Sequence, residues 1–173
     1  IEAFNQMPDK KLVIVGKGTR EKELKSMAGD NITFLNRLSA TELADTYANC
    51  KALIFPQLED YGITPLEAAA SGRPVIAFGK GGVLETMIPY TNDASKATAV
   101  FFDEQTTSSL KGAIADFEEL NFDPQFIRAH AETFDETAFV NKIRSFVVNK
   151  YNLKNEQQEV RVIGRAKAGK VAI

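Results

Sequence analysis

The sequence has few of the residues from which disulfides and metal sites are built. It contains one cysteine, Cys50, and one histidine, His130, among 173 residues. A single cysteine excludes an intrachain disulfide, and a histidine with no second histidine or cysteine nearby is an implausible metal ligand. Asp-x-Asp occurs nowhere in the chain, so we expect no metal held by that motif. We interpret Cys50 as a small buried side chain and His130 as a solvated or packed one.

Long apolar runs and an excess of charge are absent as well. No stretch approaches the roughly 18 apolar residues that a membrane-spanning helix needs, and no pattern is typical of a signal peptide. We therefore expect a cytoplasmic protein with no transmembrane segment. The net charge is −2, so no broad basic field predicts a nucleic acid as partner. Any recognition of phosphate must then be local.

Short apolar segments alternate with helical patterns along most of the chain. Strands are predicted near residues 11–15, 31–35, 52–55, 74–78 and 99–102. The first of them is continuously apolar, which is typical of a parallel strand covered on both faces. We therefore predict an α/β fold with a mainly parallel sheet and helices on both faces. Ligands of such a sheet bind at the carboxyl ends of its strands.

Helical patterns dominate from Thr106 onward, and the two ends of the chain differ from its middle. Residues 1–7 read as the end of a helix already in progress, so we expect the chain to begin inside a domain. Residues 154–173 hold five Lys or Arg against two Glu and form a basic tail of uncertain order, without an assigned function. Apolar side chains at helical spacing before that tail are expected in the core; they include Phe139, Ile143, Phe146 and Val147.

The stretch Phe55–Ala77 combines the features of an anion-binding helix N-terminus. A strand leads into a loop that holds Glu59 and Gly62, and Thr64-Pro65-Leu66-Glu67 predicts a capping box at the start of a helix. Gly62 removes a Cβ where backbone amides must approach a ligand closely. Amide donors at the positive end of a helix suit the phosphates of a nucleotide.

Two carboxylates frame this helix start. Glu67 accepts hydrogen bonds only, so it can take them from paired hydroxyls such as those of a ribose, and Glu59 can do the same for a second polyol. Taken alone, Glu67 could merely reach back to the Thr64 amide, and Glu59 could be a solvated loop acid. Both alternatives would have to hold at once beside the full flanking pattern, so we favour the binding roles.

Two further segments follow predicted strands in the first part of the chain. Gly16-Lys17-Gly18 lacks the third glycine of a dinucleotide site, since Glu21 stands there. The P-loop pattern is missing as well, because no Gly-Lys-Ser/Thr follows a glycine at the required spacing. This turn either connects a strand to a helix or lines the same cleft, with Lys17 near the phosphates. Arg37 could stack on a purine base or be solvated. An NAD-linked dehydrogenase is disfavoured by the incomplete glycine pattern.

The turn after the fourth strand contains Gly81 and Gly82. These glycines either serve only the turn or admit a diphosphate or a sugar close to the backbone. The sequence alone does not distinguish these two roles of Gly81 and Gly82.

The two acids, eight positions apart, resemble the signature of retaining nucleotide-sugar glycosyltransferases with the two-domain GT-B fold, known as glycosyltransferase group 1 or family 4. Glu59 and Glu67 match its acids, Tyr61-Gly62-Ile63 its aromatic-glycine-aliphatic turn, and Gly81-Gly82 its glycine pair. The amino-acid sequence from Glu59 to Glu67 is most similar to that of O-antigen-type mannosyltransferases. The resemblance spans about residues 1–150.

The resemblance implies that residues 1–153 are a Rossmann-like donor-binding domain, the C-terminal half of a GT-B enzyme truncated at its N-terminus. Such an enzyme moves a hexose, here favouring mannose, from a nucleoside diphosphate sugar such as GDP-mannose to an acceptor hydroxyl with retention. Glu59 would hold the sugar and Glu67 the ribose, and no metal is expected. The resemblance extends the donor-binding set to Gly16, Lys17, Gly18, Arg37, Tyr61, Gly62, Ile63, Thr64, Gly81 and Gly82.

The resemblance also implies partners. The acceptor would be a glycan or a lipid-linked glycan in polysaccharide or glycoconjugate synthesis, bound through an N-terminal domain, and the full enzyme could contact the inner face of a membrane peripherally. We expect the 173-residue chain alone to be inactive. The alternatives are a non-catalytic nucleotide-sugar-binding module and a GT-B epimerase or phosphorylase.

Overall fold

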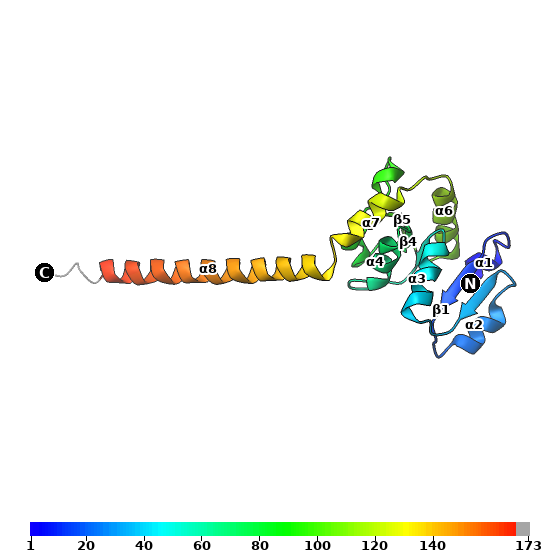
Figure 1. Cartoon of the computed structure of the whole chain (residues 1–173), viewed down its shortest axis with the longest axis horizontal. Helices are drawn as coiled ribbons and strands as arrows, with labels where there is room; N and C mark the ends of the chain where they lie inside the picture. Colours follow the sequence, from blue (N-terminus) through cyan, green and yellow to red (C-terminus); the bar gives the residue numbers. More distant parts are fainter. Residues whose placement is uncertain (169–173) are drawn as a thin grey trace. The chain divides into compact units, whose positions relative to one another are not determined.

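The computed structural model describes residues 1–168, with the side chains of residues 1–154 (Figure 1). It divides into two units, Ile1–Glu132 and the segment from Thr133 onward, each of which is described by itself. The elements of the first unit are α1 (Glu2–Asn5), β1 (Leu12–Val15), α2 (Glu21–Met27), β2 (Ile32–Leu35), α3 (Ala40–Asn49), β3 (Leu53–Phe55), α4 (Ile63–Ala70), β4 (Val75–Phe78), α5 (Val83–Thr86), the 3-10 turn η1 (Ala94–Lys96), β5 (Ala99–Phe102), α6 (Thr107–Glu118) and α7 (Pro124–Glu132). The predicted alternation of strands and helices is confirmed.

The strands are all parallel, and in the described chain they form two sheets. β1 pairs with β2, with Leu12 opposite Ile32 and Val15 opposite Leu35. β4 lies between β3 and β5 in the other sheet, where Val75 is opposite both Leu53 and Ala99. The predicted α/β class with parallel strands is therefore correct, although the strands do not form one continuous ladder.

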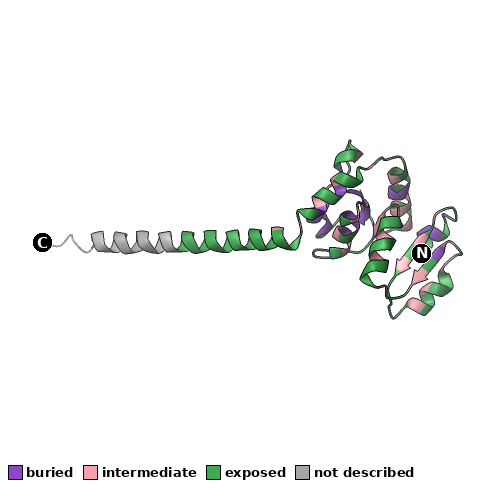
Figure 2. Cartoon of the chain, in the orientation of Figure 1, coloured by how far each residue is buried: buried purple, intermediate pink, exposed green. Residues whose placement is uncertain are grey.

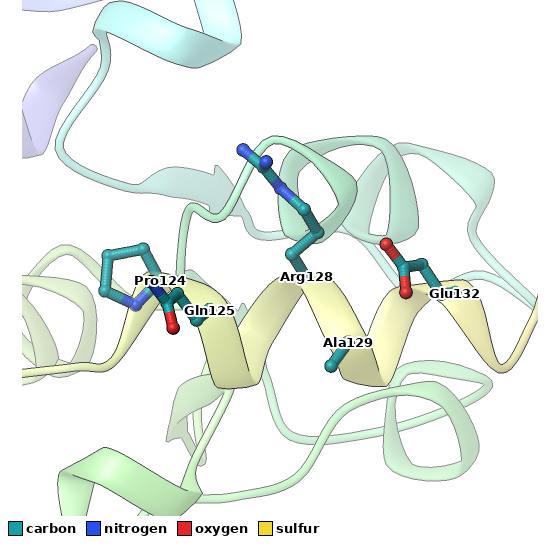
Figure 3. Close-up of a pocket in the computed structure, with 5 residues that line it drawn as sticks. All are labelled: Pro124, Gln125, Arg128, Ala129 and Glu132. Atoms are coloured by element: carbon teal, nitrogen blue, oxygen red, sulfur yellow. The ribbon is translucent and has the colours of Figure 1, made fainter.

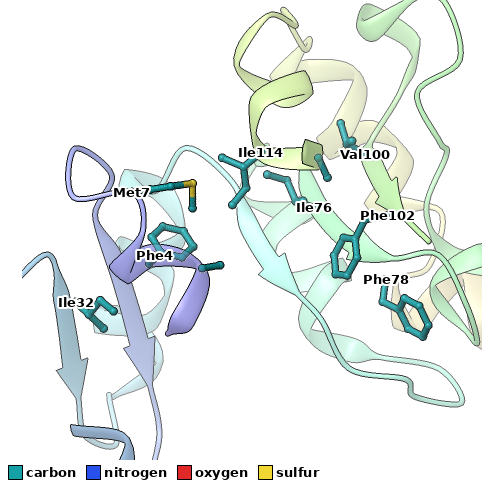
Figure 4. Close-up of a cluster of buried hydrophobic side chains, with 10 residues drawn as sticks. Phe4, Met7, Ile32, Ile76, Phe78, Val100, Phe102 and Ile114 are labelled. Atoms are coloured by element: carbon teal, nitrogen blue, oxygen red, sulfur yellow. The ribbon is translucent and has the colours of Figure 1, made fainter. Parts of the chain in front are cut away.

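β4 is the central strand of the larger sheet, and all four of its residues are buried. Val75 and Ala77 belong to one apolar cluster, which includes side chains of α4 and Ile127 of α7. Ile76 and Phe78 belong to a second cluster, which includes Ile114 of α6 and residues of α1 (Figure 4). Because successive strand residues point to opposite faces, this division shows helices covering both faces of the sheet.

β1 departs from the expectation of two covered faces. Leu12 and Ile14 pack against the second cluster, whereas Val13 and Val15 are 48% and 39% exposed. A continuously apolar strand is thus half-buried on one face and exposed on the other in this structure. The apolar run alone could not distinguish this case from a strand with two covers, because it shows no alternation.

The second unit is described as a single helix, α8 (Glu136–Ala168). Its residues Phe139, Ile143, Phe146 and Val147 are between 46% and 63% exposed, and Figure 2 shows the buried residues gathered in the first unit instead. The prediction that these four side chains lie in a core is therefore wrong, because the described part of this unit offers no second element to pack on. α8 continues across position 154, so the predicted domain boundary there remains a prediction, and residues 169–173 of the predicted tail lie outside the described residues.

The C-terminus of α4 is closed by a Schellman motif. The Gly72 amide donates to the Ala69 carbonyl at 2.8 Å, and the Arg73 amide donates to the Ala68 carbonyl at 3.0 Å. Gly72 adopts a left-handed conformation with φ of 72°. A Cβ at this position would lie 3.0 Å from the carbonyl oxygen of Pro124, where α7 begins. Gly72 therefore ends α4 and also allows α7 to pack closely against it.

Gly72→Ala should lower the free energy of unfolding by roughly 1–2 kcal/mol or more, because alanine disfavours positive φ and its Cβ would press on Pro124. Gly112→Ala is a matched control, since Gly112 lies exposed inside α6 with nothing within 4 Å of a built Cβ. That substitution should raise stability by about 0.5–1 kcal/mol through helix propensity. Urea unfolding of both variants measures the difference, and equal effects would contradict this account.

Candidate functional site

The loop between β3 and α4 holds the first predicted acid and ends in a glycine with special geometry. Gly62 is the N-cap of α4, with φ of 79° and ψ of 88°. A Cβ on it would lie 3.1 Å from Cζ of Phe55, whose side chain is buried at the end of β3. The left-handed turn and the close packing both require glycine here, so the chain can turn sharply from the loop into the helix.

This turn moves the start of α4 and overturns the predicted capping box. The helix begins at Ile63, so Thr64 lies in its first turn instead of capping it, and no side chain caps the helix. Glu67 therefore does not reach back to the Thr64 amide. Pro65 still occupies the first turn, where its missing N–H costs no hydrogen bond. The backbone amides of Gly62, Ile63 and Thr64 lie at a helix start that no side chain caps. An anion site requires such amide donors.

Glu67 lies one turn into α4 and contacts a residue that sequence patterns did not single out. The hydroxyl of Tyr47, on α3, donates a hydrogen bond to Oε2 of Glu67 at 3.0 Å. Burial of the half-buried tyrosine raises the pKa of Tyr47, and the Glu67 carboxylate raises this pKa further. Tyr47 therefore remains protonated, and Glu67 keeps this donor, throughout the physiological pH range.

Glu59 is exposed in the loop, and its neighbours hold the loop in place. Its Oε1 accepts a hydrogen bond from the side-chain amide of Gln57 at 3.2 Å. The carbonyl of Glu59 accepts from the Gly82 amide at 2.8 Å. Gln105, in the connection after β5, donates to the Pro56 carbonyl at 2.8 Å. The loop backbone is thus anchored at Pro56 and at Glu59, while the Glu59 carboxylate stays accessible.

Gly81 and Gly82, predicted from their position after β4, lie directly against this loop. A Cβ on Gly81 would lie 2.5 Å from the Glu59 carbonyl oxygen, and a Cβ on Gly82 would lie 2.5 Å from Cα of Tyr61. Gly81 also has a left-handed φ of 77°. The glycine pair is therefore explained by the close approach between the backbone of the turn after β4 and the backbone of the Glu59 loop. It brings together the predicted residues Glu59, Tyr61, Gly62, Gly81 and Gly82.

The other predicted residues follow the strands of the smaller sheet. The Gly16 amide donates to the Leu35 carbonyl at 3.0 Å, which places the turns after β1 and β2 at one edge. Gly16, Lys17, Gly18 and Arg37 are all exposed there. Their roles in donor binding remain predictions, as do those of the residues around Glu59.

His130 and Cys50 are not among the predicted donor-binding residues. His130 is packed, which is one of the two alternatives predicted for it. Its Nε2 donates a hydrogen bond to the Thr86 carbonyl at 2.8 Å. Cys50 is half-buried at the end of α3, and burial raises the pKa of its thiol. Among the residues that the structure describes, no group of three His, Cys, Asp or Glu is arranged to hold a metal ion. No helix in the described range is long and apolar enough to cross a membrane.

Two surface hollows of the described residues are lined by neither of the two acids. One lies along α7 and is lined by Pro124, Gln125, Arg128, Ala129 and Glu132 (Figure 3). Another lies between β5 and α6 and includes Tyr90 and Leu120. Glu59 and Glu67 are instead exposed on the surface. The candidate site of this chain is therefore an open edge built from loops and a helix start.

Comparisons with known proteins agree with the resemblance seen in the sequence. The family model described as "Glycosyl transferases group 1" matches residues 1–138. A GDP-mannose-dependent monoacylated alpha-(1-6)-phosphatidylinositol monomannoside mannosyltransferase of Corynebacterium glutamicum is 39% identical over 95 residues, which cover 49% of this chain and 25% of that protein. An O-antigen chain mannosyltransferase of Salmonella typhimurium is 32% identical over 92 residues, covering 53% of this chain and 24% of the relative. The chain therefore spans about a quarter of the length of these relatives.

Solved structures show the same fold. Sucrose-phosphate synthase from Thermosynechococcus elongatus superimposes with a TM-score of 0.68 at 23% identity, over 88% of this chain and 41% of that one. The Anabaena protein HepE, solved in complex with UDP and glucose, gives a TM-score of 0.63 at 17% identity, over 86% and 43%. These likenesses confirm the predicted GT-B type of α/β fold.

Gly82→Ala should destabilise the chain by about 1–3 kcal/mol, because the new Cβ would overlap the backbone of the Glu59 loop. Gly18→Ala is the control, since a Cβ there meets nothing within 4 Å and should change stability by less than about 0.5 kcal/mol. Urea unfolding measures both. Equal stabilities of the two variants would show that the loop does not depend on the glycine contact.

Proposed function

The chain belongs to the glycosyl transferases group 1 family, and on this premise we propose that it is the donor-binding domain of a retaining glycosyltransferase. The proposed reaction moves a hexose, with mannose favoured, from a nucleoside diphosphate sugar to an acceptor hydroxyl. The observation that supports it most is the helix start at Gly62, where uncapped amides lie between two exposed acids. An activated sugar has a diphosphate between two polyols, so its charges and hydroxyls are complementary to this order of groups.

The diphosphate is proposed to bind at the N-terminus of α4. Amides of Gly62, Ile63 and Thr64 can donate to phosphate oxygens, and the helix dipole favours negative charge at this end. During transfer the bond between the anomeric carbon and the phosphate oxygen breaks, and the departing diphosphate gains charge. Donors fixed before the reaction stabilise that charge without having to reorient, and Lys17 is proposed to add a positive charge.

The two acids are proposed to hold the polyols. Glu67 accepts from the ribose hydroxyls and Glu59 accepts from the hexose hydroxyls, because a carboxylate offers two oxygens and no competing donor. Tyr61 and the pair Gly81-Gly82 shape the loop between them. Arg37 is proposed to lie beside the base, where its planar guanidinium can stack. The exposed position of both carboxylates is consistent with these roles.

Mannose from GDP-mannose is the favoured donor, and the names of two relatives support it. One relative depends on GDP-mannose, and another is a mannosyltransferase that acts on the O-antigen chain. The acceptor is proposed to be a glycan or a lipid-linked glycan, bound by a further part of the enzyme. We propose that transfer takes place in the cytoplasm, with peripheral contact between the whole enzyme and the membrane.

Glu67→Gln should weaken the binding of a nucleoside diphosphate at least about tenfold, because it exchanges a charged acceptor for a neutral amide. Thermal shifts with GDP, UDP, ADP and the corresponding sugars measure the effect and identify the base. GDP and GDP-mannose should raise the melting temperature of the wild type most.

Glu119→Gln is the matched control, because it removes an exposed glutamate charge at the end of α6, outside the candidate site. This variant should respond to nucleotides as the wild type does. Equal shifts for Glu67→Gln and the wild type would contradict the assigned role of Glu67, and no shift with any nucleotide would contradict donor binding.

A further inference from the structure

The hydrogen bond between Tyr47 and Glu67 joins two helices that are 20 positions apart in the sequence. The phenol oxygen and Oε2 of Glu67 are 3.0 Å apart, and the tyrosine ring packs against the apolar cluster that contains Phe55 and Ala68. Packing of the half-buried ring limits the positions that its hydroxyl can take. A donor held in this way can fix the orientation of a surface carboxylate that would otherwise rotate freely.

The end of α3 that carries Tyr47 is itself held by α4. The Arg73 guanidinium donates through Nη2 to the carbonyl of Ala48, the residue next to Tyr47. Arg73 follows the Schellman turn of α4, so its main chain is fixed by its own hydrogen bond to Ala68. α3 and α4 are therefore linked twice, once through Arg73 and once through Tyr47. The second link ends on the predicted ribose-binding acid.

We infer that Tyr47 is a positioning residue that orients the Glu67 carboxylate for two neighbouring ribose hydroxyls. The inference rests on the proposed function, since it assigns Tyr47 a role in the same site. One hydrogen bond to Oε2 leaves Oε1 and a second lone pair on Oε2 available. With the carboxylate plane fixed, both oxygens face the diol together, and binding loses less entropy to side-chain ordering. Tyr47 need not touch the nucleotide itself.

Tyr47→Phe tests the inference, because phenylalanine keeps the packed ring and loses only the hydroxyl. Calorimetry would use the full 173-residue chain with the tightest binder among GDP, UDP and ADP, and with its 2′,3′-dideoxy counterpart. The variant should bind the ribonucleotide about tenfold more weakly and the dideoxynucleotide as well as the wild type does. Tyr90→Phe, which removes an exposed hydroxyl outside the candidate site, should change neither affinity.

A double-mutant cycle separates positioning from general support of the fold. In the Glu67→Gln background, Tyr47→Phe should have less than half of its effect on the logarithm of ribonucleotide affinity, since the group it orients is altered. An equal loss for both nucleotides, or full additivity with Glu67→Gln, would overturn the inference.

The same titrations distinguish the inference from the proposed function. If Glu67→Gln weakens ribonucleotide binding and Tyr47→Phe does not, the inference fails and the donor site stands. If the wild type binds none of the three nucleoside diphosphates, or binds the ribonucleotide and its dideoxy form equally, the ribose role of Glu67 fails and the inference falls with it.

Discussion

The close contact between the Glu59 loop and the turn after β4 is the constraint on which the candidate site depends. At Gly81 and Gly82 the two backbones approach to distances that leave no space for a Cβ, and a hydrogen bond from Gly82 to Glu59 joins them. The loop is therefore positioned by the sheet beneath it. β4, buried on both faces, supplies the rigid end of that contact. The accessible carboxylate of Glu59 is thus carried by a loop whose backbone is held in place.

Two capping-box patterns in this chain show how far local sequence determines structure. Ser39-Ala40-Thr41-Glu42 forms a capping box, with reciprocal bonds between Ser39 and Glu42. Thr64-Pro65-Leu66-Glu67 has the same pattern and forms none, because the preceding Gly62 adopts a left-handed conformation and takes the N-cap position. The strands were predictable from their short apolar runs. The start of α4 was not, because one residue outside the motif decides it.

Contacts between distant segments were not predictable from a single sequence. Nothing in the pattern around Tyr47 indicates that its hydroxyl meets Glu67, and nothing around Arg73 indicates a bond to Ala48. Both arise because α3 and α4 pack side by side. The predicted burial of α8 failed for a related reason. Helical spacing identifies an apolar face such as that of Phe139 and Phe146, but the spacing does not say whether another element covers it.

α4 is fixed at both of its ends, by the contact of Gly62 with Phe55 and by the contact of Gly72 with Pro124. A helix held in this way is preorganised, so its amide donors keep one direction whether or not an anion is present. Under the proposed function, the entropy of ordering these donors is already lost on folding and does not have to be lost again when the nucleotide binds. The affinity of such an edge for a diphosphate then depends on the stability of the fold itself.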